Sequence, residues 1–162
     1  MHVREATPAD RDWIERFLDE NHSRRVARRG ELVAPLDHPM LIAEAGDGQR
    51  AGLLTYIVAG DECEIHTLHT VRQWQGAGSA LIAAVRETAA RRRCRRLWLV
   101  TTNDNVDALR FYQRRGFRLT ALRPGAVDEA RRTLKPEIAE VGGHGIPLRD
   151  EIELEMPLSQ AI

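Results

Sequence analysis

The sequence lacks any apolar run long enough to span a bilayer, and its first residues, Met1–Glu5, lack the apolar core of a signal peptide. It also lacks an excess of charge of either sign, because 24 lysines and arginines balance 24 aspartates and glutamates. A net charge of zero gives no overall attraction to nucleic acid or to an anionic membrane surface. We therefore expect a cytoplasmic protein with no nucleic-acid partner and no membrane partner.

Cysteine is scarce, and the two that occur, Cys63 and Cys94, do not have the spacing of metal ligands. They fall in a strand-like segment and at a helix end, which favours buried free thiols in a reducing compartment. We expect no metal site.

Internal repeats and a linker that would separate domains are also missing. A length of 162 residues, with 43% hydrophobic and 30% charged residues, is sufficient for one hydrophobic core. The sequence therefore predicts a single domain over residues 1–162.

Strand-like segments alternate with amphipathic helices along the chain. A helix is expected after the start signal Thr7-Pro8-Ala9-Asp10, and a short one from Gly125 to about Leu134. The arginine-rich segment Asn21–Leu36 could be a short helix and loop, and Gly46-Asp47-Gly48 is typical of a hairpin turn. The predicted strands are Met1–Glu5, Met40–Ala45, Ala51–Val58, Glu62–Val71, Arg96–Thr102, Arg118–Leu122 and Glu151–Met156.

The stretch from Asp61 to Phe117 organises the rest of the chain. The strand Glu62–Val71 runs into a glycine turn and then into a long amphipathic helix. A second strand, Arg96–Thr102, is apolar on both faces, and a second helix follows it. This order is a βαβα unit.

The glycine turn has the sequence Gln73-Trp74-Gln75-Gly76-Ala77-Gly78-Ser79. Backbone N–H groups are unpaired at a helix N-terminus and can hold phosphate oxygens, and the helix dipole favours the negative charge. The missing side chains of Gly76 and Gly78 let a phosphate approach the backbone. Alone the pattern is weak, because a third glycine is absent and the two glycines could form only a turn and a helix start.

A second motif, Asn105-x-x-Ala108-x-x-Phe111-Tyr112-x-x-x-Gly116-Phe117, follows the strand Arg96–Thr102. Together, at this spacing, the two stretches closely resemble the GCN5-related N-acetyltransferase (GNAT) superfamily over roughly residues 61–120. The resemblance implies an α/β fold with a central mixed, mostly antiparallel sheet of about seven strands and helices on both faces. The sheet would splay open between two parallel strands, Glu62–Val71 and Arg96–Thr102.

The resemblance also implies acetyl-CoA as the acetyl-donor cosubstrate. Its pyrophosphate would lie on the backbone amides of Gln73–Ser79, its pantetheine arm along the strand edge near His66–Leu68, and Asn105, Ala108 and Tyr112 would add contacts. Asn105 could equally be a helix cap. Gln73 stands where the family often has arginine, and Trp74-Gln75 stand where small or basic residues are commoner, which would weaken the phosphate contacts.

Three residues are candidates for acid–base catalysis. Tyr112 matches the position where this family often carries its general acid, and a phenol with a reference pKa of about 10 suits protonation of a thiolate. A half-buried structural aromatic is the alternative. Glu64 and then Glu62 are candidates for the base, because both lie on one face of the strand. A surface acid or an ion-pair partner is the alternative for each, and the N–H of Leu68 is the implied oxyanion donor.

Histidines near these residues have less defined roles. His66 shares the face of Glu64 and could relay a proton or bind substrate. His69 points the other way in a regular strand, which argues against a zinc pair. His144 lies in a glycine-rich loop that could fold over the acceptor. We expect the run Arg91–Arg96 to be a solvated helix end rather than a nucleic-acid patch.

We therefore predict an N-acetyltransferase that moves the acetyl group of acetyl-CoA to the amine of a small-molecule or peptide acceptor by direct attack in a ternary complex. The alternative is a non-catalytic CoA- or acyl-CoA-binding sensor or partner module. Glu44, Glu62 and Glu64 favour a cationic amine, whereas Arg24–Arg29 could select a carboxylate or phosphate. The resemblance also allows a homodimer.

Overall fold

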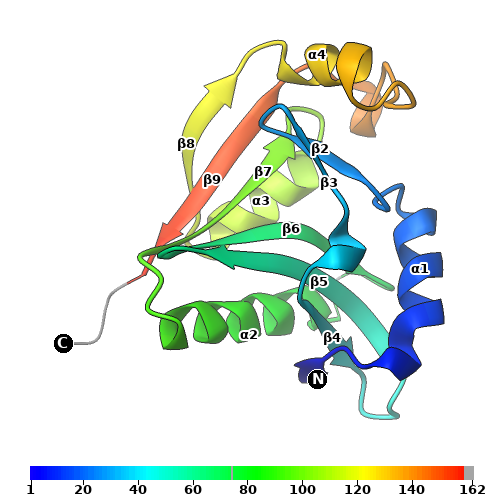
Figure 1. Cartoon of the computed structure of the whole chain (residues 1–162), viewed down its shortest axis with the longest axis vertical. Coiled ribbons are helices and arrows are strands. Elements are labelled where there is room, and N and C mark those ends of the chain that lie inside the picture. The colour runs from blue at the N-terminus through cyan, green and yellow to red at the C-terminus, as the bar shows by residue number, and fades with distance from the viewer. Residues whose placement is uncertain (74, 159–162) are drawn as a thin grey trace. The chain divides into compact units, whose positions relative to one another are not determined.

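The computed structural model describes residues 1–73 and 75–158, and the chain forms two compact units (Figure 1). The first unit contains residues 1–26, 34–97 and Leu158, and the second contains residues 27–33 and 98–157. We describe each unit by itself, and the single domain over residues 1–162 stays a prediction. No helix among the described residues is both long enough and apolar enough to cross a membrane.

The first unit is built on four antiparallel strands in the order β1-β4-β5-β6. The strands are β1 (His2–Glu5), β4 (Met40–Glu44), β5 (Arg50–Ala59) and β6 (Glu62–Thr70). A turn at Ala45–Gln49 joins β4 to β5, and Gly48 adopts a positive φ there, as predicted for a hairpin. All four strands lie where the sequence predicts them.

Two helices cover the two faces of this sheet. Helix α1 (Arg11–Glu20) follows a 3-10 turn at Pro8–Asp10 and packs Phe17 and its neighbours on Leu53 of β5. Helix α2 (Ala77–Arg91) approaches the adjacent residue, Gly52, where a Cβ would lie 3.1 Å from a methyl of Leu81. Because successive strand residues point to opposite faces, α1 and α2 lie on opposite sides of β5.

A buried carboxylate fastens α1 to the strands. Asp10 is 1% exposed and accepts two hydrogen bonds from Arg4, both at 2.8 Å, and one from Nε of Arg50 at 2.9 Å. The backbone N–H of Thr7 donates a fourth. The hydrogen bonds from Arg4 hold the pKa of the Asp10 carboxyl well below its usual range.

The second unit contains strands in the order β7-β9-β8. Strand β7 (Arg96–Thr102) begins at the end of the first unit, and β9 (Glu151–Pro157) pairs antiparallel with β8 (Arg118–Arg123). Helix α3 (Val106–Arg114) connects β7 to β8, and α4 (Ala126–Thr133) follows β8. These elements also lie where the sequence predicts them.

The expectation of a short helix within Asn21–Leu36 is wrong. The segment contains two short paired strands, β2 (Val26–Arg28) and β3 (Glu31–Val33), followed by a 3-10 turn at Pro35–Asp37. The two residues between the strands, Arg29 and Gly30, have φ of +52° and +78°. Two consecutive positive φ values are the signature of the tight hairpin turn whose twist matches the strands.

The fold class predicted from the sequence is confirmed. The described residues contain seven long strands, β1 and β4 to β9, mostly antiparallel, together with four α-helices. The splay between β6 and β7 stays a prediction.

Candidate functional site

Strand β6 contains a β-bulge at His66. The pairs on either side of it are Tyr56 with Ile65 and Thr55 with Thr67. His66 therefore has no partner on β5. Residues that are paired across two strands point to the same face of the sheet, so Glu64 and Thr67 lie on one face, although a regular strand would separate them.

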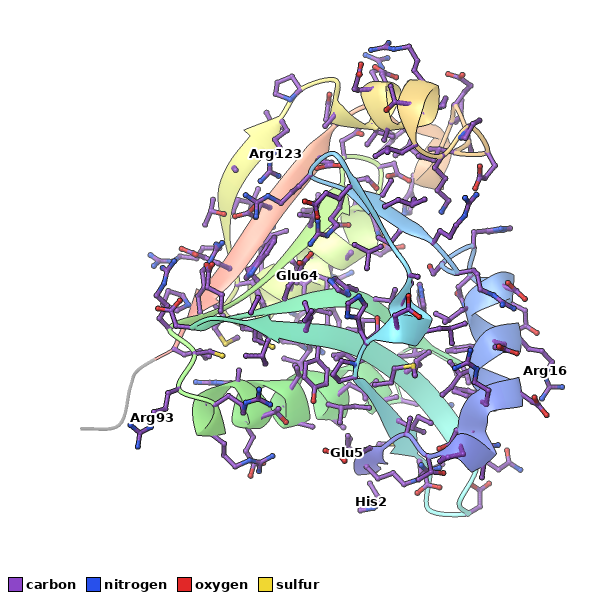
Figure 2. The ribbon with its side chains drawn as sticks, viewed as in Figure 1. His2, Glu5, Arg16, Glu64, Arg93 and Arg123 are labelled. Carbon is purple, nitrogen blue, oxygen red and sulfur yellow. The ribbon has the colours of Figure 1, made fainter. Side chains whose placement is uncertain are left out.

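Two buried ionisable side chains lie together beside the bulge. The side chains of Glu64, which Figure 2 shows on β6, and of His66 are 5% and 1% exposed, and Nε2 of His66 lies 3.4 Å from Oε1 of Glu64. The ring of His38 lies edge-on to that of His66, with 5.0 Å between centroids. Neither ring nitrogen of His66 has a hydrogen-bond partner among the described residues. A buried polar group without a hydrogen bond lowers the stability of the fold by roughly 1–3 kcal/mol, so a contribution to stability does not explain why an imidazole is buried here.

The prediction that His69 points to the opposite face is wrong, because the bulge changes the alternation beyond His66. His69 lies edge-on to Phe17 of α1, with 6.2 Å between ring centroids, and its Nε2 is 2.8 Å from Oγ of Ser23. Burial lowers the pKa of His69 to about 4, so the ring is neutral at neutral pH. No group of three or more His, Cys, Asp or Glu side chains in residues 1–73 and 75–158 is arranged to hold a metal ion.

Glu62, the second candidate base, is held by two arginines. Its Oε1 accepts hydrogen bonds from Nε of Arg96 and from Nη2 of Arg95, the latter at 3.1 Å. The backbone N–H of Arg95 also donates to the carbonyl of Asp61 at 2.6 Å. Glu62 thus joins the start of β6 to the corner that follows α2, which is the ion-pair alternative that the sequence left open.

The glycine turn leads into the N-terminus of α2, and its N-cap residue has no side chain. Gly76 is that N-cap and has a φ of +89°, and beyond its two chain neighbours no atom of the described residues lies within 4 Å of where its Cβ would be. Glycine adopts this conformation without strain. The first turn of α2 contains no acidic residue. The N–H of Ala80 bonds to the carbonyl of Gly76 at 3.0 Å, and the N–H groups before it are those that a helix leaves outside its own ladder.

The other residues predicted to bind acetyl-CoA in the first unit surround this turn. Gln73, Gln75 and Ser79 are exposed, whereas Ala77 and Gly78 are buried in the first turn of α2. Trp74 lies outside the described residues. Leu68 is paired with Leu54 of β5 and is half-buried.

Helix α3 carries the predicted residues of the second unit. Oδ1 of Asn105 accepts a hydrogen bond from the N–H of Ala108 at 3.2 Å, so the helix-cap alternative for Asn105 is confirmed. Tyr112 is 8% exposed, and its ring lies edge-on to those of Phe111 and Phe117. Burial raises the pKa of the Tyr112 phenol above its usual value, so the hydroxyl keeps its proton at neutral pH.

The connection from α4 to β9 is attached to the residues that follow β7, which the sequence analysis missed. The carboxylate of Asp104 accepts a hydrogen bond from the N–H of Gly143 at 2.8 Å, and a Cβ on Gly142 would lie 2.0 Å from the same carboxylate. The adjacent glycines were the available signal, since close approach of backbone requires them. His144 is exposed, and its Nε2 lies 3.3 Å from Asp107.

Two buried glutamates on β9 were also missed. Glu151 and Glu153 are 2% and 7% exposed, and Arg123 donates a hydrogen bond to Glu153. The backbone N–H of Arg29, at the tip of the β2–β3 hairpin, donates to Oε1 of Glu151 at 3.1 Å. The alternation of acidic and apolar residues on β9 is that of a strand with one solvated face. The hairpin that covers this face was not predicted.

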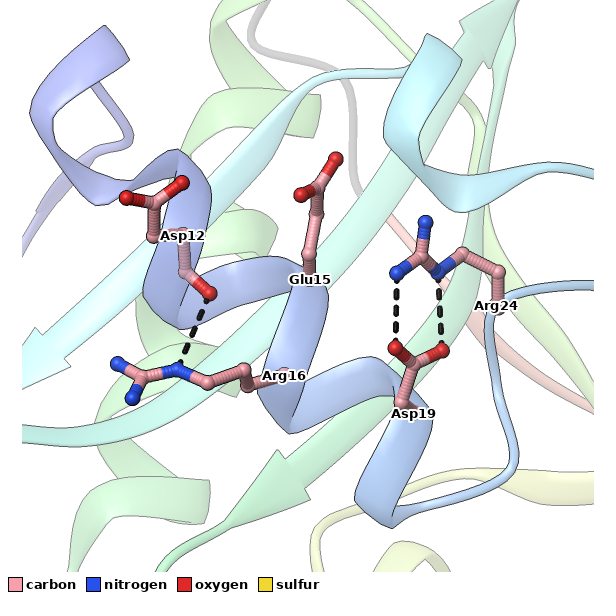
Figure 3. Close-up of a pocket in the computed structure, with 5 residues that line it drawn as sticks. All are labelled: Asp12, Glu15, Arg16, Asp19 and Arg24. Atoms are coloured by element: carbon pink, nitrogen blue, oxygen red, sulfur yellow. Dashed lines mark hydrogen bonds and ion pairs between the residues drawn. The ribbon is translucent and has the colours of Figure 1, made fainter.

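A shallow hollow of about 470 Å³ lies along the exposed side of α1 (Figure 3). Its lining side chains bind one another, since both oxygens of Asp19 accept hydrogen bonds from Arg24 at 2.9 and 2.8 Å. Nε of Arg16 donates to the carbonyl of Asp12. The hollow contains no residue of the predicted site.

The chain matches known proteins in sequence and in structure. The model of the acetyltransferase (GNAT) family matches residues 6–117. The uncharacterized protein YdhI of Bacillus subtilis (strain 168) is 49% identical over 105 residues, which span 65% of this chain and 65% of YdhI, just under two thirds of each.

Two solved structures share the fold. A Bacillus subtilis acetyltransferase in complex with CoA aligns with a TM-score of 0.70 at 19% identity, over 98% of this chain and 99% of that one. A GNAT family acetyltransferase from Elizabethkingia anophelis with acetyl-CoA bound aligns with a TM-score of 0.69 at 20% identity, over 97% of each chain.

Proposed function

Because the chain belongs to the acetyltransferase (GNAT) family, we propose that it transfers the acetyl group of acetyl-CoA to an amine of a small molecule or peptide. The observation that carries this proposal is the buried pair of Glu64 and His66 on β6, on the strand that leads into the N-terminus of α2. The pair supplies acid–base groups, and the helix N-terminus supplies a site for phosphate.

The turn before α2 fits the pyrophosphate of acetyl-CoA. The left-handed Gly76 leaves open space at its Cβ position, and the first turn of α2 carries no carboxylate that would repel an anion. The helix dipole and the outward N–H groups favour negative charge there. The structures of a CoA complex and of an acetyl-CoA complex with the same fold support this assignment. Exposed Gln73 and Gln75 would add amide donors to the backbone groups.

Acetyl-CoA supplies a thioester whose carbonyl carbon is attacked by the neutral amine. The new bond joins nitrogen to that carbon, the carbon–sulfur bond breaks, and the amine loses one proton while the departing thiolate gains one. We assign the proton for the thiolate to Tyr112, whose raised pKa keeps its hydroxyl protonated. The N–H of Leu68 is the proposed donor to the oxyanion.

The proton from the amine leaves by way of β6. Of the two glutamates on this strand, Glu64 is the better candidate for acid–base catalysis, because Arg95 and Arg96 already bind the Glu62 carboxylate. Glu64 is 4% exposed and lies next to an imidazole. The acidic groups of this strand suit an acceptor that arrives as a cationic ammonium. We infer a cytoplasmic location and keep the homodimer as a prediction.

Release of free CoA thiol from acetyl-CoA in the presence of a panel of amines tests the proposal. We expect acceptor-dependent release, with kcat lowered in both Glu64→Gln and Tyr112→Phe. Glu62→Gln is the matched control, because it makes the same change two residues away and should retain turnover.

A thermal melt with saturating acetyl-CoA separates enzyme from binding module. At a hundredfold excess over the Kd, binding adds about 2.7 kcal/mol of stability. A stabilised protein that releases no thiol with any amine would be a non-catalytic binding module. A protein with neither stabilisation nor release would contradict both functions.

A further inference from the structure

We propose that Nδ1 of His66 accepts the proton of the acceptor amine and that Glu64 is a positioning residue which orients the imidazole. This inference rests on the proposed acetyl transfer and names the atom that takes the proton. It rests on three features of the first unit: the bulge, the contact between the two side chains, and the imidazole nitrogens without hydrogen bonds.

The bulge leaves His66 without a partner on β5. Every other residue from Glu62 to Thr70 is paired with a residue of β5, whereas His66 is an extra residue between two pairs. Bulges re-aim a side chain at the expense of local pairing and are frequent beside active sites. The extra residue here is an imidazole with a side chain that is 1% exposed.

The contact with Glu64 decides which nitrogen is the base. Nε2 faces Oε1 of Glu64 at 3.4 Å, a distance that is long for a hydrogen bond in the absence of substrate. A carboxylate beside one ring nitrogen favours the tautomer that carries its proton there, because the N–H can point at the negative oxygen. The lone pair is then on Nδ1, which is buried and lacks a hydrogen-bond partner among the described residues.

The other polar groups on this side of the sheet are already engaged. Oγ1 of Thr67 is 2.8 Å from Oγ1 of Thr55, and the ring of His69 is bonded to Ser23. From the segment packed against β6, His38 presents its ring to His66. Within residues 1–73 and 75–158, the titratable groups in contact with His66 are Glu64 from its own strand and His38 from the turn after Pro35–Asp37.

The chemistry favours the imidazole over the carboxylate as the group that takes the proton. A neutral imidazole keeps an N–H on one ring nitrogen and a lone pair on the other, so it can accept a proton while its N–H stays on the Glu64 carboxylate. The step moves one proton from the ammonium nitrogen of the acceptor to Nδ1 and leaves a neutral amine. The proton that this amine loses on attack restores the Tyr112 hydroxyl, which has protonated the thiolate. The imidazolium that results is stabilised by the Glu64 carboxylate and returns the proton to water after the product leaves.

The first arm of the test is kinetic. We expect His66→Gln to lower kcat at least a hundredfold, and Glu64→Gln to lower it less, because glutamine still accepts the Nε2 proton without the charge. The double variant His66→Gln/Glu64→Gln should be no slower than His66→Gln alone, since two residues that act as a unit are not additive. His69→Gln is the control, because it removes another imidazole of β6 that lies outside this pair.

The second arm is the ¹⁵N NMR spectrum of the folded protein, which reports the ring tautomers without turnover. We expect a single His66 signal set with the proton on Nε2, and a mixture of tautomers in Glu64→Leu, which cannot accept a hydrogen bond. Wild-type protein that turns over while His66→Gln stays within threefold of it overturns this inference alone. A wild-type spectrum in which the His66 proton lies on Nδ1 also overturns this inference alone. Wild-type protein that acetylates no amine overturns the proposed function instead, whatever the tautomer.

Discussion

A comparison of Gly76→Asp with Gly76→Asn tests the phosphate site, because the two variants differ by a single negative charge. Both side chains have the same shape, and both residues tolerate the left-handed conformation that Gly76 adopts at a φ of +89°. Beyond the two chain neighbours, no described atom lies within 4 Å of its Cβ position, and Asp and Asn place their remaining atoms alike. Any loss of stability is therefore common to the two variants and cancels in their comparison.

The expected difference follows from Coulomb's law. Gly76 is exposed, so the dielectric constant near that of water applies, and a unit charge about 4 Å away contributes about 1 kcal/mol. A pyrophosphate carries two such charges, which gives about 2 kcal/mol. We therefore expect Gly76→Asp to bind acetyl-CoA roughly thirtyfold more weakly than Gly76→Asn.

Isothermal titration calorimetry of both variants with acetyl-CoA measures this ratio directly. Because the effect is electrostatic and exposed, it should shrink in 1 M salt, where charges are screened within about 3 Å. Dissociation constants that agree within threefold at low salt would mean that no phosphate lies on this turn. The proposed position of the pyrophosphate would then be wrong.

Further predictions concern stability and thiol chemistry. Asp10→Asn should cost about 3 kcal/mol, the lower end of the cost of removing one partner of a buried ion pair, and lower the Tm by about 6–12 °C. Since the folded pKa of Asp10 lies below its unfolded value of about 3.9, this stabilisation is complete above about pH 4 and is lost as the pH falls further, so the two melting curves should converge in acid. Asn105→Ala should cost about 1 kcal/mol by removing the cap of α3, measured by urea unfolding, whereas Asn105→Asp should keep the cap. Cys63 and Cys94 are buried free thiols, and burial raises the pKa of Cys63 to about 12, so neither should react with a disulfide reagent until the protein unfolds.

Local patterns were sufficient for most of the fold and for one part of the site. The strands of the first unit follow from alternation and turn residues near each one, and the start of α2 follows from the glycine turn before an amphipathic run. The cap at Asn105 is likewise a matter of three neighbouring residues. Each of these features is decided within a short stretch of chain.

Features that depend on a distant partner could not be read from the sequence. The β2–β3 hairpin has strands of only three residues each, too short for a periodic signal. The bulge at His66 exists because of its register with β5, so the sequence alternation of β6 gave the wrong face for His69. The burial of Glu151 depends on Arg29, 122 residues earlier in the chain.

Because of the bulge on β6, one residue of this strand can be removed without changing the pairing of the others with β5. If His66 were deleted, Ile65 would still be paired with Tyr56 and Thr67 with Thr55, and the ladder would become continuous. Deletion of a residue farther from the bulge would instead turn the residues between the cut and the bulge to the wrong face. We therefore expect the protein without His66 to fold and to bind acetyl-CoA but to lose turnover. Removal of His66 would therefore leave the β5–β6 pairing intact and abolish acetyl transfer.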